Sequence, residues 1–266
     1  IEVSHGPTLV DHNLMLSDRS LKLATQGVAL VHNLICGSLV SVGIGTDNGA
    51  PIIPSPRYTP YHVHHGTQIA GFMTILHGDM KFYNNIFIQK KIRSCMKALS
   101  ELMGSDGNMW DNCNMITGTS PYDEYPTFEQ WKKNFEGYCG MGSDVGDLYY
   151  EHLPVWASGN CYFNGARPWK KESAAISDTE NTVSISLEQK DGGWYLHTNL
   201  YDFLPENADG IISTETLGIA FEPEQKYENP DGSPIIFNQD FSGEHRDVLT
   251  CAGPFINKES ASRKLF

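Results

Sequence analysis

The chain has 266 residues, of which 40% are hydrophobic, so it is long enough and apolar enough to bury a sizeable core in one or two domains. Its formal net charge of −13 argues against a nucleic-acid partner, because a phosphate backbone is held by clustered Lys and Arg side chains. The chain contains no apolar run as long as the roughly 18 residues that a membrane-spanning helix needs, so we expect no membrane partner.

Four short segments share one pattern, an asparagine at a bend followed by a short apolar run. The asparagines are Asn13, Asn33, Asn85 and Asn160. Asn13 and Asn33 lie 20 residues apart, about one coil of a parallel β-helix. Asparagine tolerates left-handed torsions, and its amide can bond to the equivalent amide one coil away. The repeat predicts stacked rungs; four unrelated strands with a common turn residue are the alternative.

The first two rungs are expected within residues 1–48, where Val28 and Leu30 belong to an alternating apolar pattern. The chain opens in what looks like mid-strand, so we expect an upstream segment or a second chain to complete the β-helix. Residues 49–68 combine four prolines with tyrosines and histidines, which indicates a loop that serves as a binding wall. The third rung is expected at 75–88.

A long excursion is expected at 89–150, with helical patterns around 90–103 and 128–135. The fourth rung returns at 153–163. This organisation predicts a first domain at 1–172 that consists of parallel β-helix rungs and the excursion.

The periodicity changes to two after residue 173, with an Asp-Gly-Gly turn between two alternating segments. We interpret 173–232 as an inserted β-sandwich and 233–266 as a return to the β-helix edge. The expected fold class is therefore all-β, a right-handed parallel β-helix interrupted by a β-sandwich domain, with a partly helical excursion.

The six cysteines show neither the C-x-x-C spacing of a zinc site nor the density of a disulfide scaffold. They are Cys36, Cys95, Cys113, Cys139, Cys161 and Cys251. We expect free, buried thiols in a reducing compartment, which favours a cytoplasmic location, with an extracellular location as the open alternative.

Two carboxylates are candidates for catalysis. Asp79 follows Gly78 directly before the third rung, where a glycine lets the backbone approach a ligand closely. Glu151 lies between aromatic residues that would desolvate it and raise its pKa, so that it could donate a proton at neutral pH. The alternatives are a turn residue for Asp79 and a solvated residue for Glu151.

Carboxylates on adjacent rungs start from backbones about 4.8 Å apart, so a separation of about 5 to 5.5 Å between their carboxyl groups is attainable. That separation is typical of a retaining glycosidase. Trp156 and Tyr61 could stack on sugar rings, and the histidines His62, His64 and His65 could bond to hydroxyls. Alternate histidines of an extended segment could instead share a metal ion, but we favour a site without metal or cofactor.

Several separated stretches of the chain resemble glycoside hydrolase family 120, a family of β-xylosidases. They are Ile1 to Asn13, Val31 to Leu34, Arg57 to His62, Gly78 to Phe87, Leu153 to Ala166 and Asp240 to Phe255. The resemblance implies a right-handed parallel β-helix with an inserted β-sandwich, and retaining hydrolysis of β-1,4-xylosides. It implies that Asp79, in Gly-Asp before Phe-Tyr-Asn-Asn, is the nucleophile. A Glu on a neighbouring rung would be the acid/base, with Glu151 the first choice and Glu124 and Glu101 the alternatives.

The expected function is a retaining, exo-acting glycoside hydrolase that releases xylose from the non-reducing end of β-1,4-xylo-oligosaccharides. The expected sugar site comprises Arg57, Tyr61, His62, His65 and Trp156. An inverting hydrolase, a pectic lyase and a non-catalytic glycan-binding solenoid remain open alternatives. The edges of such a fold can pair, so we also expect a homo-oligomer.

Overall fold

The computed structural model describes residues 1–3, 6–41, 58–95, 97–98, 115–137, 151–205, 210–247, 251–256 and 262–266. These residues form mostly β-strands with a few short helices. None of the helices among them is long and apolar enough to cross a bilayer.

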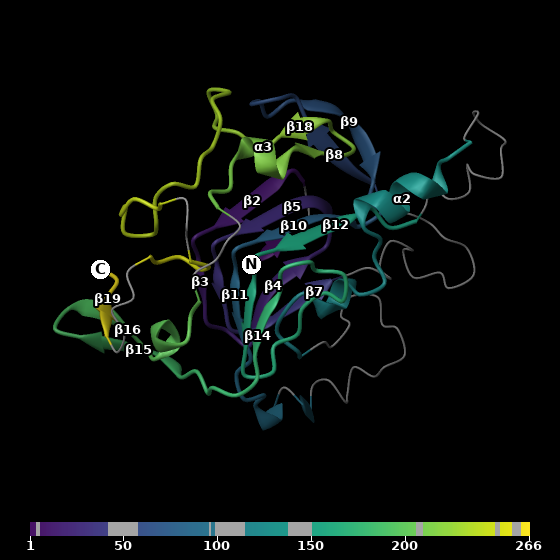
Figure 1. The fold of residues 1–266 in the computed structure, drawn as a ribbon. Coiled ribbons are helices and arrows are strands. Elements are labelled where there is room, and N and C mark those ends of the chain that lie inside the picture. Colours follow the sequence, from purple (N-terminus) through teal and green to yellow (C-terminus); the bar gives the residue numbers. More distant parts are fainter. Residues whose placement is uncertain are drawn as a thin grey trace.

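Three parallel sheets make up the centre of the molecule (Figure 1). The first sheet contains β1 (Glu2–Val3), β4 (Arg19–Leu23) and β7 (Ser38–Ser41). The second contains β2 (Thr8–Asp11), β5 (Gln26–Val31), β10 (Gly78–Tyr83) and β12 (Val155–Ser158). The third contains β3 (Leu14–Met15), β6 (Leu34–Ile35), β11 (Ile86–Ile88), β13 (Cys161–Phe163) and β14 (Ile176–Asp178).

Successive strands visit the sheets in turn, and each coil lies parallel to the one before it. Val28 of β5 pairs with Thr8 of β2 on one side and with Met80 of β10 on the other. Met80 in turn pairs with Val155 of β12. This stacking is consistent with the all-β, β-helix-like fold that the asparagine repeat predicts, with rungs at the four expected places.

The four asparagines form one hydrogen-bonded ladder along the stack. The Asn13 amide donates to Asn33 Oδ1 at 3.2 Å, Asn33 to Asn85 Oδ1 at 2.9 Å, and Asn85 to Asn160 Oδ1 at 3.0 Å. Asn160 ends the ladder on Glu172 Oε1 at 2.8 Å. The predicted amide contact between equivalent positions of successive coils is therefore confirmed.

The left-handed torsions lie one residue before the ladder, and not on the asparagines as expected. His12, His32 and Asn84 have φ of 51°, 54° and 55°, and Gly159 has 67°. The bend is thus made by the preceding residue, which leaves each ladder asparagine free to point its amide along the stack.

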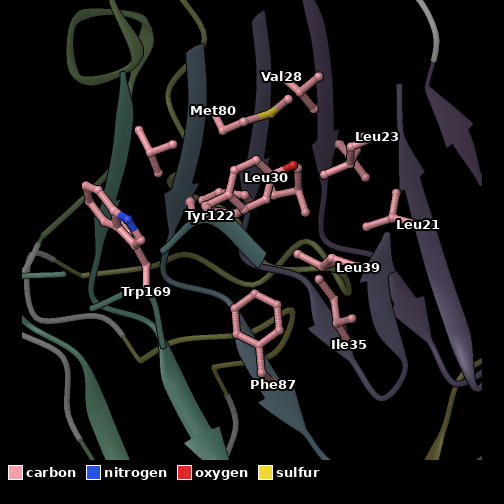
Figure 2. Close-up of a cluster of buried hydrophobic side chains, with 14 of the residues drawn as sticks. Leu21, Leu23, Val28, Leu30, Ile35, Leu39, Met80, Phe87, Tyr122 and Trp169 are labelled. Carbon is pink, nitrogen blue, oxygen red and sulfur yellow. The ribbon is translucent and has the colours of Figure 1, made fainter. Parts of the chain in front are cut away.

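The interior of the coils is apolar. Val28, Leu30, Met80 and Phe82 belong to a buried cluster to which all three sheets contribute. Figure 2 shows members of this cluster side by side, with Tyr122 and Trp169 among them. The second sheet is also covered on its other face, where Ala29 and Val31 pack in a separate cluster. A sheet buried on both faces explains why β5 reads as an almost continuous apolar run.

The cover over this outer face comes from a later part of the chain. It includes α3 (Thr214–Leu217) and the short antiparallel pair β17 (Ile219–Ala220) and β18 (Gln225–Lys226). The hairpin of β8 (Tyr58–His62) and β9 (Ile69–Thr74) lies beside it in Figure 1. Leu217 and Tyr227 of this cover pack in one cluster with Ala29 and Val31 of the sheet.

The excursion contains η2 (Ser120–Tyr122) and α2 (Phe128–Asn134) among its described residues. The helix expected near 128–135 is confirmed, and it begins with a capping box between Thr127 and Gln130. Of the helix expected at 90–103, Ser94, Cys95, Lys97 and Ala98 are helical, and its last residues lie outside the described part of the chain.

An antiparallel sheet follows the coils, formed by β15 (Ile185–Lys190), β16 (Gly193–Thr198) and β19 (Arg263–Lys264). The predicted turn is confirmed: Asp191 and Gly192, with φ of 50° and 76°, connect the paired Lys190 and Gly193. β14, from the segment assigned to the sandwich, extends the third parallel sheet. A further short helix in the described part of the chain is η4 (Leu200–Asp202). The division into domains at 172 and 232 stays a prediction.

The thiols of Cys36, Cys161 and Cys251 are free and buried, as expected, and Cys95 is free and exposed. Burial raises the pKa of the Cys36 and Cys161 thiols to about 12. These buried thiols pack as small apolar side chains in a further buried cluster, which also contains Ile86 and Phe163.

Candidate active site

The third rung presents the candidate nucleophile on the outer face of the second sheet. Met80 and Phe82 point into the coil, so the alternation of a strand turns Asp79, Lys81 and Tyr83 outward. Lys81 pairs in register with Trp156 of the neighbouring coil. The outer face of β10 and β12 is therefore the floor of the site.

Residues with positive φ are concentrated at the start of this strand, next to Asp79. His77, Gly78 and Asp79 all have positive φ, at 57°, 89° and 48°. A Cβ on Gly78 would lie 2.1 Å from the carbonyl oxygen of Leu153, so only glycine allows the two coils to approach this closely. Strained conformations of this kind cluster at functional sites, which supports Asp79 as a functional residue.

Both carboxylate oxygens of Asp79 are held by the protein. Lys81 Nζ forms an ion pair with Oδ1, and the Phe221 amide donates to Oδ2 at 2.8 Å. Only 1% of the Asp79 side chain is exposed. Burial raises the pKa of Asp79, and the charge and hydrogen bond of Lys81 oppose that rise. The pKa of Lys81 is lowered by the same burial.

Two aromatic rings hold the Lys81 ammonium over the sheet. Its Nζ lies 4.7 Å from the centre of the Trp156 ring and 5.1 Å from that of Tyr227. The buried Tyr227 hydroxyl has no hydrogen-bond partner among the described residues. Burial, and then the charge of Asp79, raise the pKa of this phenol. Tyr227 therefore places a buried hydroxyl without a partner among the described residues close to the Asp79–Lys81 pair.

A cavity of about 340 Å³ opens above these residues. Its walls come from β10, β12, α2 and the covering segment: Lys81, Tyr83, Phe128, Trp156, Thr216, Leu217, Gly218, Ile219 and Phe221. Asp79 lies directly behind Lys81 and Phe221 and does not itself line the cavity. A larger hollow of about 670 Å³ lies between the coil edge near Ile88 and the start of β15. We place the site in the smaller one because it adjoins the only buried Asp–Lys ion pair among the described residues.

Aromatic side chains of α2 close one side of this cavity. The Phe128 ring lies 6.0 Å from that of Trp156, and the Trp131 ring lies 4.7 Å from that of Phe221 in an edge-to-face contact. Because Phe221 also holds Asp79, α2 is connected to the carboxylate through a single residue.

Glu151 lies at the entry to the coil that neighbours β10. His152 Nδ1 contacts the Leu76 oxygen at 2.8 Å, and the Leu153 amide donates to the His77 oxygen. Glu151 therefore lies beside the segment that precedes β10. Its exposed carboxylate accepts from Asn134 Nδ2 at 3.2 Å. Its expected desolvation is therefore wrong, and its role as the acid/base stays a prediction.

The alternative acids lie elsewhere. Glu124 has a side chain that is 91% exposed and pairs with Lys170 at 3.6 Å. Glu101 lies outside the described residues. Glu222 is a further candidate carboxylate, because it directly follows Phe221, whose amide donates to Asp79. No sequence pattern indicated this residue.

The predicted sugar-binding residues separate into two groups. Trp156 lines the cavity. Tyr61 packs on Gly71, His62 Nδ1 contacts the Thr67 oxygen at 3.1 Å and His65 contacts Glu228, so these three belong to the β8–β9 hairpin beside the cavity. Arg57 lies outside the described residues. The roles of these residues in binding stay predictions.

Fold and site together describe an all-β protein of stacked parallel strands, with a buried Asp–Lys pair beneath aromatic rings. The chain is similar to a solved structure, the complex structure of XylC with xylose, with 28% sequence identity and a TM-score of 0.76. The similarity covers 100% of this chain and 37% of XylC, so the chain spans a little over a third of the length of XylC. No family model and no curated protein matches the chain.

Proposed function

We propose that this protein is a glycoside hydrolase that releases xylose from the non-reducing end of β-1,4-xylo-oligosaccharides with retention of configuration. The observation that carries the proposal is the likeness to XylC in complex with xylose over the whole chain, together with a strained, buried Asp79 beside an aromatic-lined cavity. A right-handed parallel β-helix is the fold that this proposal entails.

In this mechanism Asp79 attacks the anomeric carbon while the bond to the leaving oxygen breaks, and an acid donates its proton to that oxygen. The same group then takes a proton from water, whose oxygen displaces Asp79 from the sugar. The ammonium of Lys81 and the amide of Phe221 favour the anionic form of Asp79 and oppose the rise in its pKa that burial causes. The sugar must reach Asp79 between Lys81 and Phe221, so substrate binding has to part these two contacts.

Glu151 remains our first candidate for the acid/base, with Glu124, Glu101 and Glu222 as the carboxylates against which it has to be compared. Glu151 belongs to the segment that joins α2 to β12, and its partner Asn134 is the last residue of α2. A shift of α2 on substrate binding would therefore carry this carboxylate with it.

The test is hydrolysis of an aryl β-xyloside by the wild-type protein and by Asp79→Ala. We expect the variant to lose about 10⁴-fold or more in kcat. Azide should restore turnover of Asp79→Ala and give α-xylosyl azide, because it attacks the face that the carboxylate leaves open. Azide with the true acid/base variant should give β-xylosyl azide, which distinguishes Glu151→Ala from the other Glu variants.

Asp191→Asn serves as the matched control, since Asp191 is an exposed turn residue with a left-handed φ that asparagine tolerates. It should retain the wild-type rate. Undiminished hydrolysis by Asp79→Ala would rule out the assigned nucleophile.

A second function, xylose binding without turnover, is favoured by one observation. Both oxygens of Asp79 already have protein partners, and the side chain is 1% exposed. A protein that binds xylose in calorimetry but leaves every aryl glycoside intact would establish this binding function instead.

A further inference from the structure

Three potential metal ligands converge outside the catalytic cavity, at the tip of the β8–β9 hairpin. His64 and His65 form part of the turn, and Glu228 lies just after β18 on the covering segment. The ligand atoms of the three residues all lie within 4.8 Å of one another. His64 Nε2 is 2.7 Å and His65 Nε2 is 3.0 Å from the same oxygen, Oε1 of Glu228.

This set differs from the alternating pair that the sequence suggests. His62 turns to the Thr67 oxygen, and consecutive histidines converge instead because His65 has a left-handed φ of 53°. Their ring centres lie 3.9 Å apart. Backbone hydrogen bonds stabilise the turns that carry these residues. The Gly66 amide donates to the Val63 oxygen at 2.8 Å in the hairpin, and the Asn229 amide donates to the Ser233 oxygen at 2.9 Å in the turn after Glu228.

Charge favours a cation at this position. The Glu228 side chain is only 8% exposed, and within the described part of the chain its ion-pair partners are the two histidines. Asp231 lies close by: hydrogen bonds from Ser233 lower its pKa, and the charge of His65 contributes to that lowering. A poorly solvated carboxylate without Lys or Arg needs another compensating charge.

We propose that His64, His65 and Glu228 bind one divalent transition-metal ion of the Zn²⁺ class, which joins the β8–β9 hairpin to the segment that carries Phe221 and Tyr227. Two imidazoles and one carboxylate are a common zinc ligand set, with a fourth position for water. Tetrahedral ligands about 2.1 Å from the ion stand about 3.4 Å apart, so the side chains need only small shifts. His64, which is 51% exposed, has room for such a shift.

The consequence is local rigidity. Gln225 Nε2 already donates to the His62 oxygen at 2.6 Å, and the ion would add a second, stronger link between hairpin and cover. The proposal does not depend on the glycosidase activity, because metal binding is measured directly.

The test is titration of the metal-free protein with Zn²⁺ by calorimetry, and with Co²⁺ by visible absorption. We expect one ion per chain, the intense visible bands of tetrahedral Co²⁺, and a rise in Tm with Zn²⁺. His64→Ala, His65→Ala and Glu228→Gln should each weaken binding by more than about tenfold. His197→Ala, which removes an exposed histidine from its pair with Glu188, should bind as the wild type does.

His64→Ala is the most informative variant, because His64 is exposed and its replacement should leave folding unaffected. Its circular dichroism spectrum in EDTA should match that of the wild type. The absence of saturable Zn²⁺ binding by the wild type, or equal binding by the wild type and all three ligand variants, would overturn the proposal.

Discussion

At the scale of single residues, the Asp79–Lys81 pair is the least replaceable feature of the site. Both side chains are almost fully buried, at 1% and 4% exposure. Removing two charges from water costs free energy that the pair recovers only through mutual attraction and further contacts. The Phe221 amide and the Trp156 and Tyr227 rings supply those contacts. Loss of either partner leaves an uncompensated charge.

Lys81→Met is expected to lower the free energy of unfolding by about 3 to 5 kcal/mol at neutral pH. Asp79 then lacks its cation, and its pKa rises further. A carboxyl with a raised folded-state pKa contributes stability below its unfolded pKa and loses it as pH rises through the folded value. The deficit should therefore be smaller at about pH 4.5 than at about pH 8 in urea unfolding.

Lys170→Met is the control, because Lys170 forms an exposed pair with Asp123. That variant should leave the free energy of unfolding close to the wild-type value at either pH. A pH-independent deficit for Lys81→Met would contradict the account of the buried pair.

At the scale of elements, the asparagine ladder holds successive coils in register. Asn85 Oδ1 accepts from Asn33 N and Nδ2, and its own amide donates to the Leu30 oxygen and to Asn160 Oδ1. Every polar atom of this buried side chain is therefore used. Asn13, by contrast, lies at the end of the ladder and is only partly buried.

Asn85→Ala should lower the free energy of unfolding by about 3 kcal/mol or more, since several buried polar groups lose their partner at once. Asn13→Ala should cost about 1 kcal/mol. Denaturant unfolding of both variants measures the difference. Equal costs would mean that burial along the ladder does not determine its contribution.

At the scale of the whole molecule, the site exists only because distant segments meet on the second sheet. The floor comes from β10 and β12, the lid from α2 and the far wall from the segment around Phe221. The Phe221–Asp79 hydrogen bond joins residues 142 positions apart. α2 itself buries no residue fully, so its contribution is to the cavity more than to the core.

Trp131→Ala should therefore change activity more than stability. The edge-to-face contact between Trp131 and Phe221 contributes about 1 kcal/mol to the position of Phe221, which binds Asp79. Because 1 kcal/mol corresponds to about fivefold in affinity, KM for an aryl xyloside should rise about fivefold. The free energy of unfolding should fall by no more than about 1 kcal/mol. Trp194→Ala, on β16 away from the cavity, should leave KM unchanged. Equal KM for both variants would contradict a role for α2 at the site.

The fold could be predicted to the extent that it rests on local repetition. The spacing of Asn13 and Asn33, the apolar runs after each asparagine and the Asp191–Gly192 turn each constrain the chain within a few residues. Which residue makes the bend could not be predicted. Left-handed torsions are possible for both the asparagine and the residue before it, and only the stacking of the coils selects between the two.

By itself, the sequence determined the stacked coils and drew attention to Asp79 and Trp156, because a bend residue, a glycine and strand alternation act over neighbouring positions. Tertiary structure alone decided that Phe221 and Tyr227 lie near Asp79. It also decided that the exposed Glu151 accepts a hydrogen bond from Asn134, and that His65 contacts Glu228, 163 residues away in the sequence. These contacts arise where the covering segment folds back on the coils. No local pattern encodes such a meeting, since it depends on the path of the whole chain.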